Sequence, residues 1–281
     1  MENERTHTRY SSGTRTTERA IDAARTPQVA PARDELTERS RRIWGDGDYD
    51  RIAAGFRDEA RAFVDRLSLR PGQLVLDAAA GSGNLTIPAA RTGATVTGID
   101  LVPSLLSAAS RWAASEGLTV NFDVVLSMFG VMFAARPDRV IAELARVTRP
   151  GGRVVLANWT RGGFIGKMLA KHAAVAPPPA GVPSPLLWAD ETVLRERFDQ
   201  RTWEITTTPR ILTFHYPSTP AGTAELFRTA YGPTVRAFAV LDEDRRATFA
   251  ADLAAHWSWH QRGENATEVD SEYLEVVAVR R

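Results

Sequence analysis

Short apolar runs alternate with amphipathic, helix-like segments between residues 35 and 160. The first amphipathic segment places Ile43, Ile52, Phe56 and Phe63 at the three-to-four spacing of a helix face. Beyond it, four short segments are predicted to be strands, and the apolar runs at 74–76 and 124–126 suit strands buried on both faces. These predicted strands cover residues 74–76, 95–100, 124–126 and 154–157. Strands that alternate with helices indicate an α/β fold with a doubly wound, parallel sheet.

The pattern changes beyond residue 160. Five prolines between positions 176 and 185 predict a stiff loop. The segments that follow have helix-like or strand-like patterns. The helix-like segments lie near residues 190–198, 221–230 and 242–257, and the strand-like segments near 203–207, 211–216 and 273–279. Residues 1–33 contain few large apolar side chains and are expected to form a disordered tail.

The composition and charge of the chain exclude several classes of protein and partner. With 43% hydrophobic residues, the 281-residue chain can build a large core. The net charge of +1 provides no general attraction to nucleic acid or anionic membranes, and no apolar run is long enough to cross a membrane. The absence of cysteine excludes disulfides and thiolate metal sites. We therefore expect a soluble, cytoplasmic protein whose partner is a small molecule rather than nucleic acid.

Two carboxylates flank a turn of small residues after the first predicted strand. Asp77 ends that strand, Ala79, Gly81 and Gly83 follow at alternate positions, and Asp100 ends the second strand. In a doubly wound sheet, ligands bind outside the carboxyl ends of the strands. Small residues allow a ligand to approach the backbone closely, and a carboxylate accepts hydrogen bonds from ribose hydroxyls. The segment therefore predicts a site for a nucleoside cofactor.

The spacing of the turn argues against a dinucleotide. The pattern Gly-x-Gly-x-x-Gly requires a third glycine, and that place is Thr86 when counted from Gly81 and Asn84 when counted from Ala79. Asp77 would repel a pyrophosphate and attract a cation, such as the ammonium of a methionyl group. A nicotinamide-dependent oxidoreductase is therefore the less favoured alternative.

These features resemble the class I S-adenosylmethionine-dependent methyltransferases. Residues 77–83 read Asp-Ala-Ala-Ala-Gly-Ser-Gly, with alanine in the first glycine place of the family's first motif, and residues 144–152 resemble its helix end before the fifth strand. Other matches indicate the type 11 subgroup related to quinone-biosynthesis C-methyltransferases. They comprise Trp44, residues 47–49, 129–133 and 158–160, and the proline-rich loop, whereas residues 122–127 resemble the fourth strand of the whole class. The resemblance covers residues 35–281.

The resemblance implies roles for individual residues. S-adenosylmethionine is the implied cofactor, and Asp100 would bind its ribose, with Leu101 beside the adenine. Ser127 would lie near the sulfonium, Phe129 and Trp159 would contact the acceptor, and Trp44 and Tyr49 would close over the cofactor. Trp44 and Phe129 fit core packing equally well. The remaining cofactor-binding candidates lie in the turn and are Asp77, Ala79, Gly81, Gly83 and Asn84.

No catalytic residue or metal site is assigned. His256 and His260 have helical spacing, but position 257 is Trp where a zincin motif requires Glu. His172 and His215 are candidate bases for an acceptor. The implied reaction is in-line methyl transfer to a small, largely apolar acceptor, since the family needs no universal catalytic side chain.

The chain departs from the family after Val120. Only residues 118–122 separate Gly117 from Asp123, where the family has its third strand, an acidic loop beside the adenine and a short helix. Either the chain passes from the second strand directly to the family's fourth, or a distortion leaves the sheet edge bare. We expect this form to bind the cofactor weakly. A catalytically impaired S-adenosylmethionine-binding protein is therefore an alternative function.

The family's architecture implies the domain organisation. The last strand would lie antiparallel in a Rossmann-like, mostly parallel sheet. The methyltransferase domain would span residues 34–281, with a core of 70–160 and 265–281 and a small α/β cap at 161–264.

Overall fold

The computed structural model describes residues 35–100, 122–263 and 266–281. Three sequence-based predictions concern residues outside these ranges. They are the tail over 1–33, the position of Leu101 beside the adenine, and the shortened stretch that begins at residue 118.

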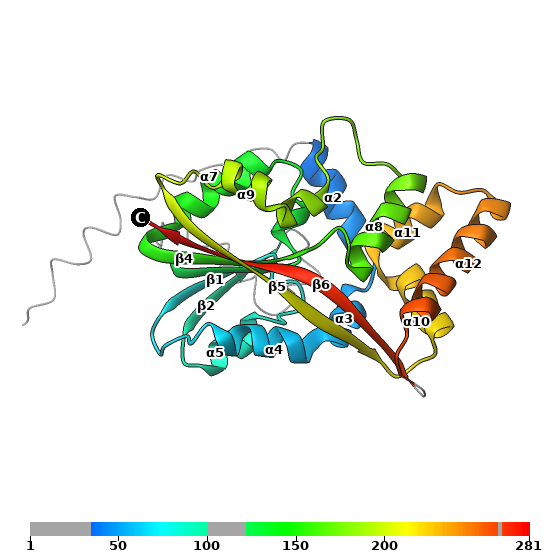
Figure 1. The fold of residues 1–281 in the computed structure, drawn as a ribbon, viewed down its shortest axis with the longest axis horizontal. Coiled ribbons are helices and arrows are strands. Elements are labelled where there is room, and N and C mark those ends of the chain that lie inside the picture. The colour runs from blue at the N-terminus through cyan, green and yellow to red at the C-terminus, as the bar shows by residue number, and fades with distance from the viewer. Residues whose placement is uncertain (1–34, 101–121, 264–265) are drawn as a thin grey trace, which may run out of the picture. The chain divides into compact units, whose positions relative to one another are not determined.

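A six-stranded sheet in the order β2-β1-β3-β4-β6-β5 forms the centre of the described chain (Figure 1). The strands β2, β1, β3 and β4 pair in parallel, whereas β6 is antiparallel to both β4 and β5. Their bounds are β1 Leu74–Ala78, β2 Thr95–Ile99, β3 Phe122–Met128, β4 Thr148–Trp159, β5 Trp203–Tyr216 and β6 Thr267–Arg280. The predicted mostly parallel α/β sheet with an antiparallel last strand is confirmed.

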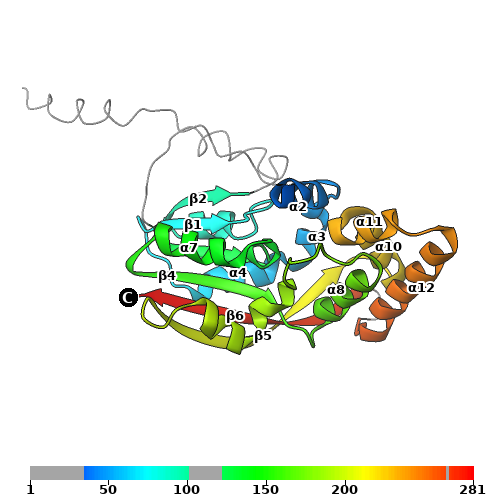
Figure 2. The ribbon, with the colours of Figure 1, turned by 90° about the horizontal axis from the view of Figure 1, so that it is seen from above.

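Helices cover both faces of the sheet, as a doubly wound fold requires (Figures 1 and 2). In Figure 1, α4 and α5 lie on one face, α2, α7 and α9 lie on the other, and α8, α10, α11 and α12 gather at one end. The α-helices are α2 Glu35–Gly45, α3 Tyr49–Ala53, α4 Arg57–Arg66, α5 Thr86–Arg91, α7 Pro137–Val147, α8 Phe164–Val175, α9 Glu191–Arg197, α10 Pro220–Ala230, α11 Gly232–Ala239 and α12 Glu243–His260. Three short 3₁₀ helices are η2 Ala54–Phe56, η3 Val131–Phe133 and η4 Pro185–Ala189.

The apolar runs of the central strands are buried because both faces of the sheet are covered. Val75, Val124, Val125, Val154 and Val155 expose 0–1% of their surface. Consecutive side chains of a strand point to opposite faces, so continuous valine and leucine runs suit a strand with helices on both sides. This packing explains why these strands can be recognised without polar–apolar alternation.

The region after β4 differs from its predicted pattern in two respects. The strand-like stretches 203–207 and 211–216 form one strand, β5, because Pro209 is tolerated at a sheet edge. The range 161–264 expected to form the cap thus supplies an edge strand of the central sheet. Helices α8 and α11 are additional elements that the apolar pattern did not predict.

The chain joins β2 to β3 through 22 residues, although β1 lies between these strands. β3 pairs directly with β1, and within the described residues β2 pairs with β1 alone. A connection between parallel strands takes a dozen or more residues. The link has room for one such crossover but not for two crossovers and a further strand. The strand order therefore agrees with direct passage from the second strand to the family's fourth.

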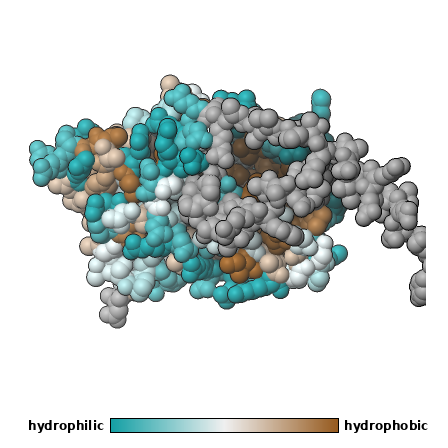
Figure 3. Space-filling model, turned by 180° about the vertical axis from the view of Figure 1, so that it is seen from behind, coloured by the Kyte–Doolittle hydropathy of each residue, from teal (hydrophilic) through white to brown (hydrophobic). Residues whose placement is uncertain are grey.

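The described surface seen from behind is mostly hydrophilic, with apolar residues in several separate patches (Figure 3). Isolated exposed apolar side chains, such as Ile211 and Trp259, are ordinary on protein surfaces. Among the described residues, no helix has both the length and the apolar character needed to span a bilayer.

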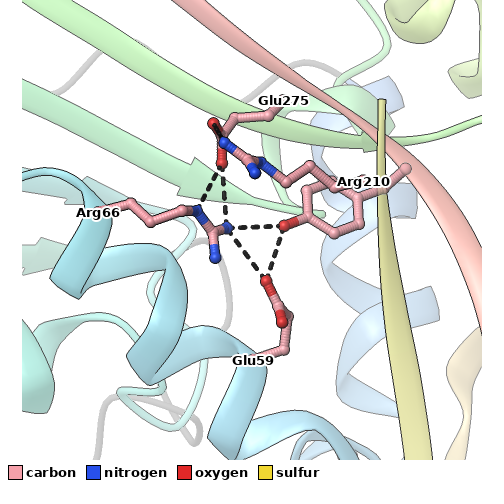
Figure 4. A network of polar contacts seen from close by, with 5 residues as sticks. Glu59, Arg66, Arg210 and Glu275 are labelled. Carbon is pink, nitrogen blue, oxygen red and sulfur yellow. Dashed lines mark hydrogen bonds and ion pairs between the residues drawn. The ribbon is translucent and has the colours of Figure 1, made fainter. Parts of the chain in front are cut away.

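A polar network fastens α4 to the last strand (Figure 4). The Arg66 guanidinium donates to Glu59 at 3.0 Å, to Glu275 at 3.0 Å and to the Tyr273 hydroxyl at 2.9 Å. Arg210 donates to the other oxygen of Glu275 at 2.9 Å. The Glu275 side chain is only 9% exposed, so its charge depends on these two arginines.

Replacing Arg66 by methionine is expected to destabilise the fold by about 2 kcal/mol, because a nearly buried carboxylate loses one of its two charged partners. Methionine retains much of the aliphatic stem, so the loss reports on the guanidinium. Urea unfolding measures it. Arg61→Met is the control, since Arg61 is 60% exposed and lies 3.9 Å from Asp58. Equal unfolding free energies for the two variants would show that the network contributes no stability.

Candidate active site

The two predicted carboxylates lie at the ends of neighbouring strands. In the β1–β2 register, Asp77 is opposite Gly98, and Ala78 is opposite Ile99. Asp100 directly follows β2, and its Oδ2 accepts a hydrogen bond from the Gly81 N–H at 2.9 Å. Asp77 and Asp100 therefore flank one turn, which is the arrangement that the sequence predicts.

The turn between them uses backbone conformations that favour glycine. Gly81 and Gly83 have φ angles of +53° and +92°, and Ala79 has a φ of +65°. A residue with a Cβ costs about 1–2 kcal/mol in this left-handed region. Ala79, which occupies the motif's first glycine place, thus adopts a conformation that favours glycine.

Asp77 is buried at the base of the turn. It is 1% exposed and accepts a 2.6 Å hydrogen bond from the Thr86 hydroxyl. Burial raises the pKa of Asp77 to about 6, with a smaller contribution from the negative charge of Asp100, although the hydrogen bonds from Thr86 act in the opposite direction. Near neutral pH, Asp77 is a carboxylate that gains from a cationic ligand.

Asp77→Asn is expected to stabilise the ligand-free protein more at pH 7 than at pH 4, by about 2–3 kcal/mol. The pKa of Asp77 is about 6 in the fold and 3.8 in a model peptide. The favourable contribution of Asp77 to the stability of the wild-type protein is therefore complete below pH 4 and disappears as the pH rises through 6. Urea unfolding of both proteins across this range measures the difference, with exposed Asp65→Asn as control. A pH-independent difference would contradict the raised pKa.

Asn84 and Ser127 hold the turn in place through their side chains. Asn84 Nδ2 donates to the Ala53 carbonyl at 2.9 Å. Ser127 Oγ donates to the Ala78 carbonyl at 2.6 Å and accepts from the Val131 N–H at 3.1 Å. In the ligand-free structure, both side chains therefore position the loop.

Phe129 and Trp159 are packed in the core. They are 3% and 4% exposed, and their rings stack with centroids 3.5 Å apart. Both rings are therefore buried against each other at the ends of β3 and β4. A contact of Phe129 or Trp159 with the acceptor stays a prediction.

Tyr49 lies over the turn. A Cβ added to Gly81 would be 3.7 Å from the Tyr49 ring, and Tyr49 packs edge-on against Trp44 with centroids 5.6 Å apart. Burial raises the pKa of the Tyr49 hydroxyl, with Asp100 adding to the effect, so the phenol stays neutral. A hollow of about 30 Å³ remains beneath it, between Asp77, Gly81 and Asn84.

A larger cavity of about 500 Å³ lies on the Trp44 side of this aromatic pair. Trp44 lines it and packs against Phe133, another lining residue, with centroids 4.8 Å apart. Most of the wall is apolar and comes from α2, η3, α8 and the proline-rich loop. Trp44 and Tyr49 thus form a shared boundary between the small hollow and this cavity.

The histidines proposed as bases lie in different surroundings. His172 lines the cavity, and its Nε2 lies 3.0 Å from the Thr234 hydroxyl. Burial lowers the pKa of His172 to about 4, so it is neutral at pH 7. His215 pairs with Glu268 on the β5–β6 ladder, at an Nδ1–Oε1 distance of 3.7 Å. His172 is the candidate that lies at a cavity.

His256 and His260 are engaged by the backbone. His256 Nε2 lies 3.1 Å from the Phe164 carbonyl, and His260 Nδ1 lies 2.8 Å from the His256 carbonyl. In the part of the chain that the structure describes, no group of three or more His, Cys, Asp or Glu residues is arranged to hold a metal ion.

Comparisons with known proteins agree with this geometry. A family model described as "Methyltransferase domain" matches residues 76–156, which include the turn, β2, β3 and most of β1 and β4. The demethylmenaquinone methyltransferase of Renibacterium salmoninarum is 33% identical over 115 residues, which cover 37% of this chain and 48% of the relative. The chain belongs to the class I S-adenosylmethionine-dependent methyltransferases. Its cofactor is S-adenosylmethionine.

The methyltransferase is similar over a longer stretch to a protein of Mycobacterium bovis, the uncharacterized protein Mb1438c. The two are 39% identical over 219 aligned positions, which cover 70% of this chain and 78% of the relative. The alignment has 219 positions, but 70% of this 281-residue chain is fewer than 219 residues. At some aligned positions, the relative therefore has a residue where this chain has a gap. Such an imbalance is expected from the internal deletion inferred after Val120.

The fold of the methyltransferase also matches a solved structure. The YcgJ protein of Bacillus subtilis superposes with a TM-score of 0.50 at 14% sequence identity, covering 80% of this chain and 99% of that protein. Similarity at this level of identity concerns the fold, and it agrees with the doubly wound sheet described above.

The residues of the methyltransferase fit the chemistry of its cofactor. Carboxylates at positions 77 and 100 suit an ammonium group and ribose hydroxyls, and the small residues between them leave the backbone accessible. A hollow of about 30 Å³ is far smaller than the few hundred Å³ that a bound cofactor occupies. The hollow shown here therefore accommodates only part of such a molecule.

Some features of this site had no signal in the sequence pattern. Thr86 was noted only as a residue that breaks a dinucleotide motif, yet its hydroxyl holds Asp77. Arg39, Arg161 and Arg236 line the large cavity from segments far apart in the chain. Only the folded arrangement brings these three arginines to the same wall.

Proposed function

We propose that the protein transfers the methyl group of S-adenosylmethionine to a small, largely apolar acceptor by in-line displacement. The observation that carries the proposal is the adjacency of two spaces. The hollow between Asp77 and Gly81 shares the Trp44–Tyr49 boundary with an apolar cavity of about 500 Å³. A cofactor in the hollow and an acceptor in the cavity would meet once these two rings turn aside from between them and cover the reacting groups instead.

The turn would hold the cofactor through Asp77, Ala79, Gly81, Gly83 and Asn84. Asp77 would face the methionyl ammonium and Asp100 would accept from the ribose hydroxyls, since carboxylates are acceptors only. Ser127 would keep the turn in position. Trp44 and Tyr49 would cover the reacting groups, which excludes water from the transfer.

The cofactor supplies an electrophilic methyl group whose leaving thioether is neutral. The protein then needs to orient the acceptor in line with the methyl group, at about 3 Å, rather than to form a covalent intermediate. His172 lines the large cavity, but its lowered pKa makes it a weak base and its Nε2 lies 3.0 Å from the Thr234 hydroxyl, so we assign it no proton transfer. This division of labour explains why no single catalytic residue stands out.

The apolar wall supports a small-molecule acceptor over nucleic acid. Alanine, proline, leucine and aromatic side chains make up most of the cavity lining. A nucleic-acid site would require an extended basic surface, and the chain has a net charge of +1. The similarity to a demethylmenaquinone methyltransferase is also consistent with an apolar acceptor.

The test uses S-adenosylmethionine labelled with tritium in its methyl group, the full chain, and the ethyl acetate extract of a mycobacterial culture. Transfer of label into the extractable fraction, reduced at least tenfold by Asp100→Asn, would support the proposal. Label that enters only added RNA or protein, or no label transfer at all, would contradict it.

A further inference from the structure

The 500 Å³ cavity carries an unbalanced positive charge. Its charged lining residues are Arg39, Arg161 and Arg236, and no Asp or Glu among the described residues lines it. Arg39 comes from α2, Arg161 follows β4 and Arg236 lies on α11. Three segments distant in sequence therefore bring cations to one otherwise apolar space.

These arginines make no ion pair with any described residue. Elsewhere in the described chain, many arginines pair with a nearby carboxylate, as Arg66, Arg149 and Arg262 do. Glu35 and Asp46 line an adjoining hollow with Arg39 and Arg236, but they form no ion pair with either. The guanidinium groups at the cavity therefore keep their capacity to bind an anion.

The positions of the arginines suit a ligand with two kinds of surface. Arg161 and Arg236 are exposed, whereas Trp44, Met132, Phe133 and Leu169 provide apolar wall that is partly or fully buried. A guanidinium binds a carboxylate or another oxyanion through paired N–H donors. An apolar body would fill the interior while its anionic group remained at the arginines.

We propose that the methyl acceptor is an apolar molecule with an anionic oxygen group, and that Arg161 and Arg236 bind this group. The inference rests on the proposed function, because it specifies the acceptor of that same site. Arg39 adds a third positive charge beside the aromatic boundary. A neutral acceptor of the same shape would leave the arginines uncompensated and bind more weakly.

The test compares three probes of one shape on the full chain by isothermal titration calorimetry. 2-Naphthoate is an anion, 2-naphthamide is neutral, and 2-naphthylmethylammonium is a cation. We expect 2-naphthoate to bind at least about tenfold more tightly than 2-naphthamide, and the cation to bind most weakly. Equal affinities for the anion and the amide, or no binding of 2-naphthoate at 1 mM, would overturn the proposal.

Arginine variants test whether the preference for the anionic probe arises at the cavity. Arg161→Gln/Arg236→Gln is expected to lower 2-naphthoate affinity about tenfold and to change 2-naphthamide affinity less than threefold. Arg201→Gln, an exposed arginine outside the cavity lining, is the control. Unchanged 2-naphthoate affinity in the double variant would also overturn the proposal.

A titration with S-adenosylmethionine separates the two proposals. The double variant should keep the wild-type affinity for S-adenosylmethionine, because neither arginine lines the small hollow. Selective binding of 2-naphthoate without any binding of S-adenosylmethionine would refute the proposed function and leave the anion site standing. Binding of S-adenosylmethionine without charge selectivity among the naphthyl probes would refute the anion site alone.

Discussion

Asp100→Asn is expected to weaken S-adenosylmethionine binding by roughly 10- to 100-fold. Hydrogen bonds to a charged group contribute about 1.5–3 kcal/mol, and asparagine removes the charge that would accept from the ribose hydroxyls. The asparagine carbonyl can still accept the Gly81 N–H that Asp100 now accepts at 2.9 Å. The turn should therefore remain folded. Isothermal titration calorimetry measures the affinity.

The control for this prediction is Asp65→Asn, which removes the same charge from the exposed end of α4. Its affinity should equal that of the wild-type protein. Thermal unfolding of both variants confirms that any loss of binding does not arise from a loss of structure. Binding by Asp100→Asn within threefold of wild type would show that Asp100 does not face the ribose.

Gly130→Ala is expected to destabilise the protein by about 2–3 kcal/mol and to disturb the cofactor turn. A Cβ on residue 130 would overlap the Cβ of Ala79 and lie 3.0 Å from Ser127 Oγ. The backbone itself tolerates alanine, since Gly130 has a φ of −106°. The cost would therefore come from the clash with Ala79.

A second substitution isolates that clash. Ala79→Gly removes the opposing Cβ and also suits the φ of +65° at position 79, so Gly130→Ala/Ala79→Gly should regain at least half of the lost stability. Urea unfolding of the two single variants and the double variant gives the coupling energy. Gly162→Ala is the control, because a Cβ at 162 meets nothing within 4 Å. Additive effects of the two substitutions would contradict a direct contact.

The paired carboxylates could be predicted because they depend on local signals. Asp77 and Asp100 each end an apolar run, and the carboxyl ends of neighbouring parallel strands meet at one sheet edge. The glycine-favouring turn was likewise visible in the alternation of small residues. For this part of the site, the order of residues along two strands determines their position in space.

The tertiary contacts around the site could not be predicted in the same way. Stacking of Phe129 on Trp159 joins the ends of β3 and β4, and the same residues would suit an acceptor contact if the rings were exposed. The strand β5 appeared as two stretches, because Pro209 interrupts its pattern without ending it. Burial and edge position depend on the whole fold, which residue spacing does not specify.

The shortened link between β2 and β3 gives a separate expectation. The family has an acidic loop beside the adenine at this point, and the 22 residues between Ile99 and Phe122 leave no room for the additional strand and crossover. We expect a dissociation constant for S-adenosylmethionine above about 100 µM, because one set of adenine contacts is lost. Micromolar binding would contradict this expectation without affecting the position of the site.

The central claim is that the turn between Asp77 and Asp100 binds S-adenosylmethionine. Calorimetric titration of the wild-type chain and of Asp77→Asn/Asp100→Asn with S-adenosylmethionine tests it most directly. The account predicts one cofactor per wild-type chain and no detectable binding by the folded double variant. Undiminished binding by the double variant, or no binding by the wild-type chain at millimolar cofactor, would contradict it.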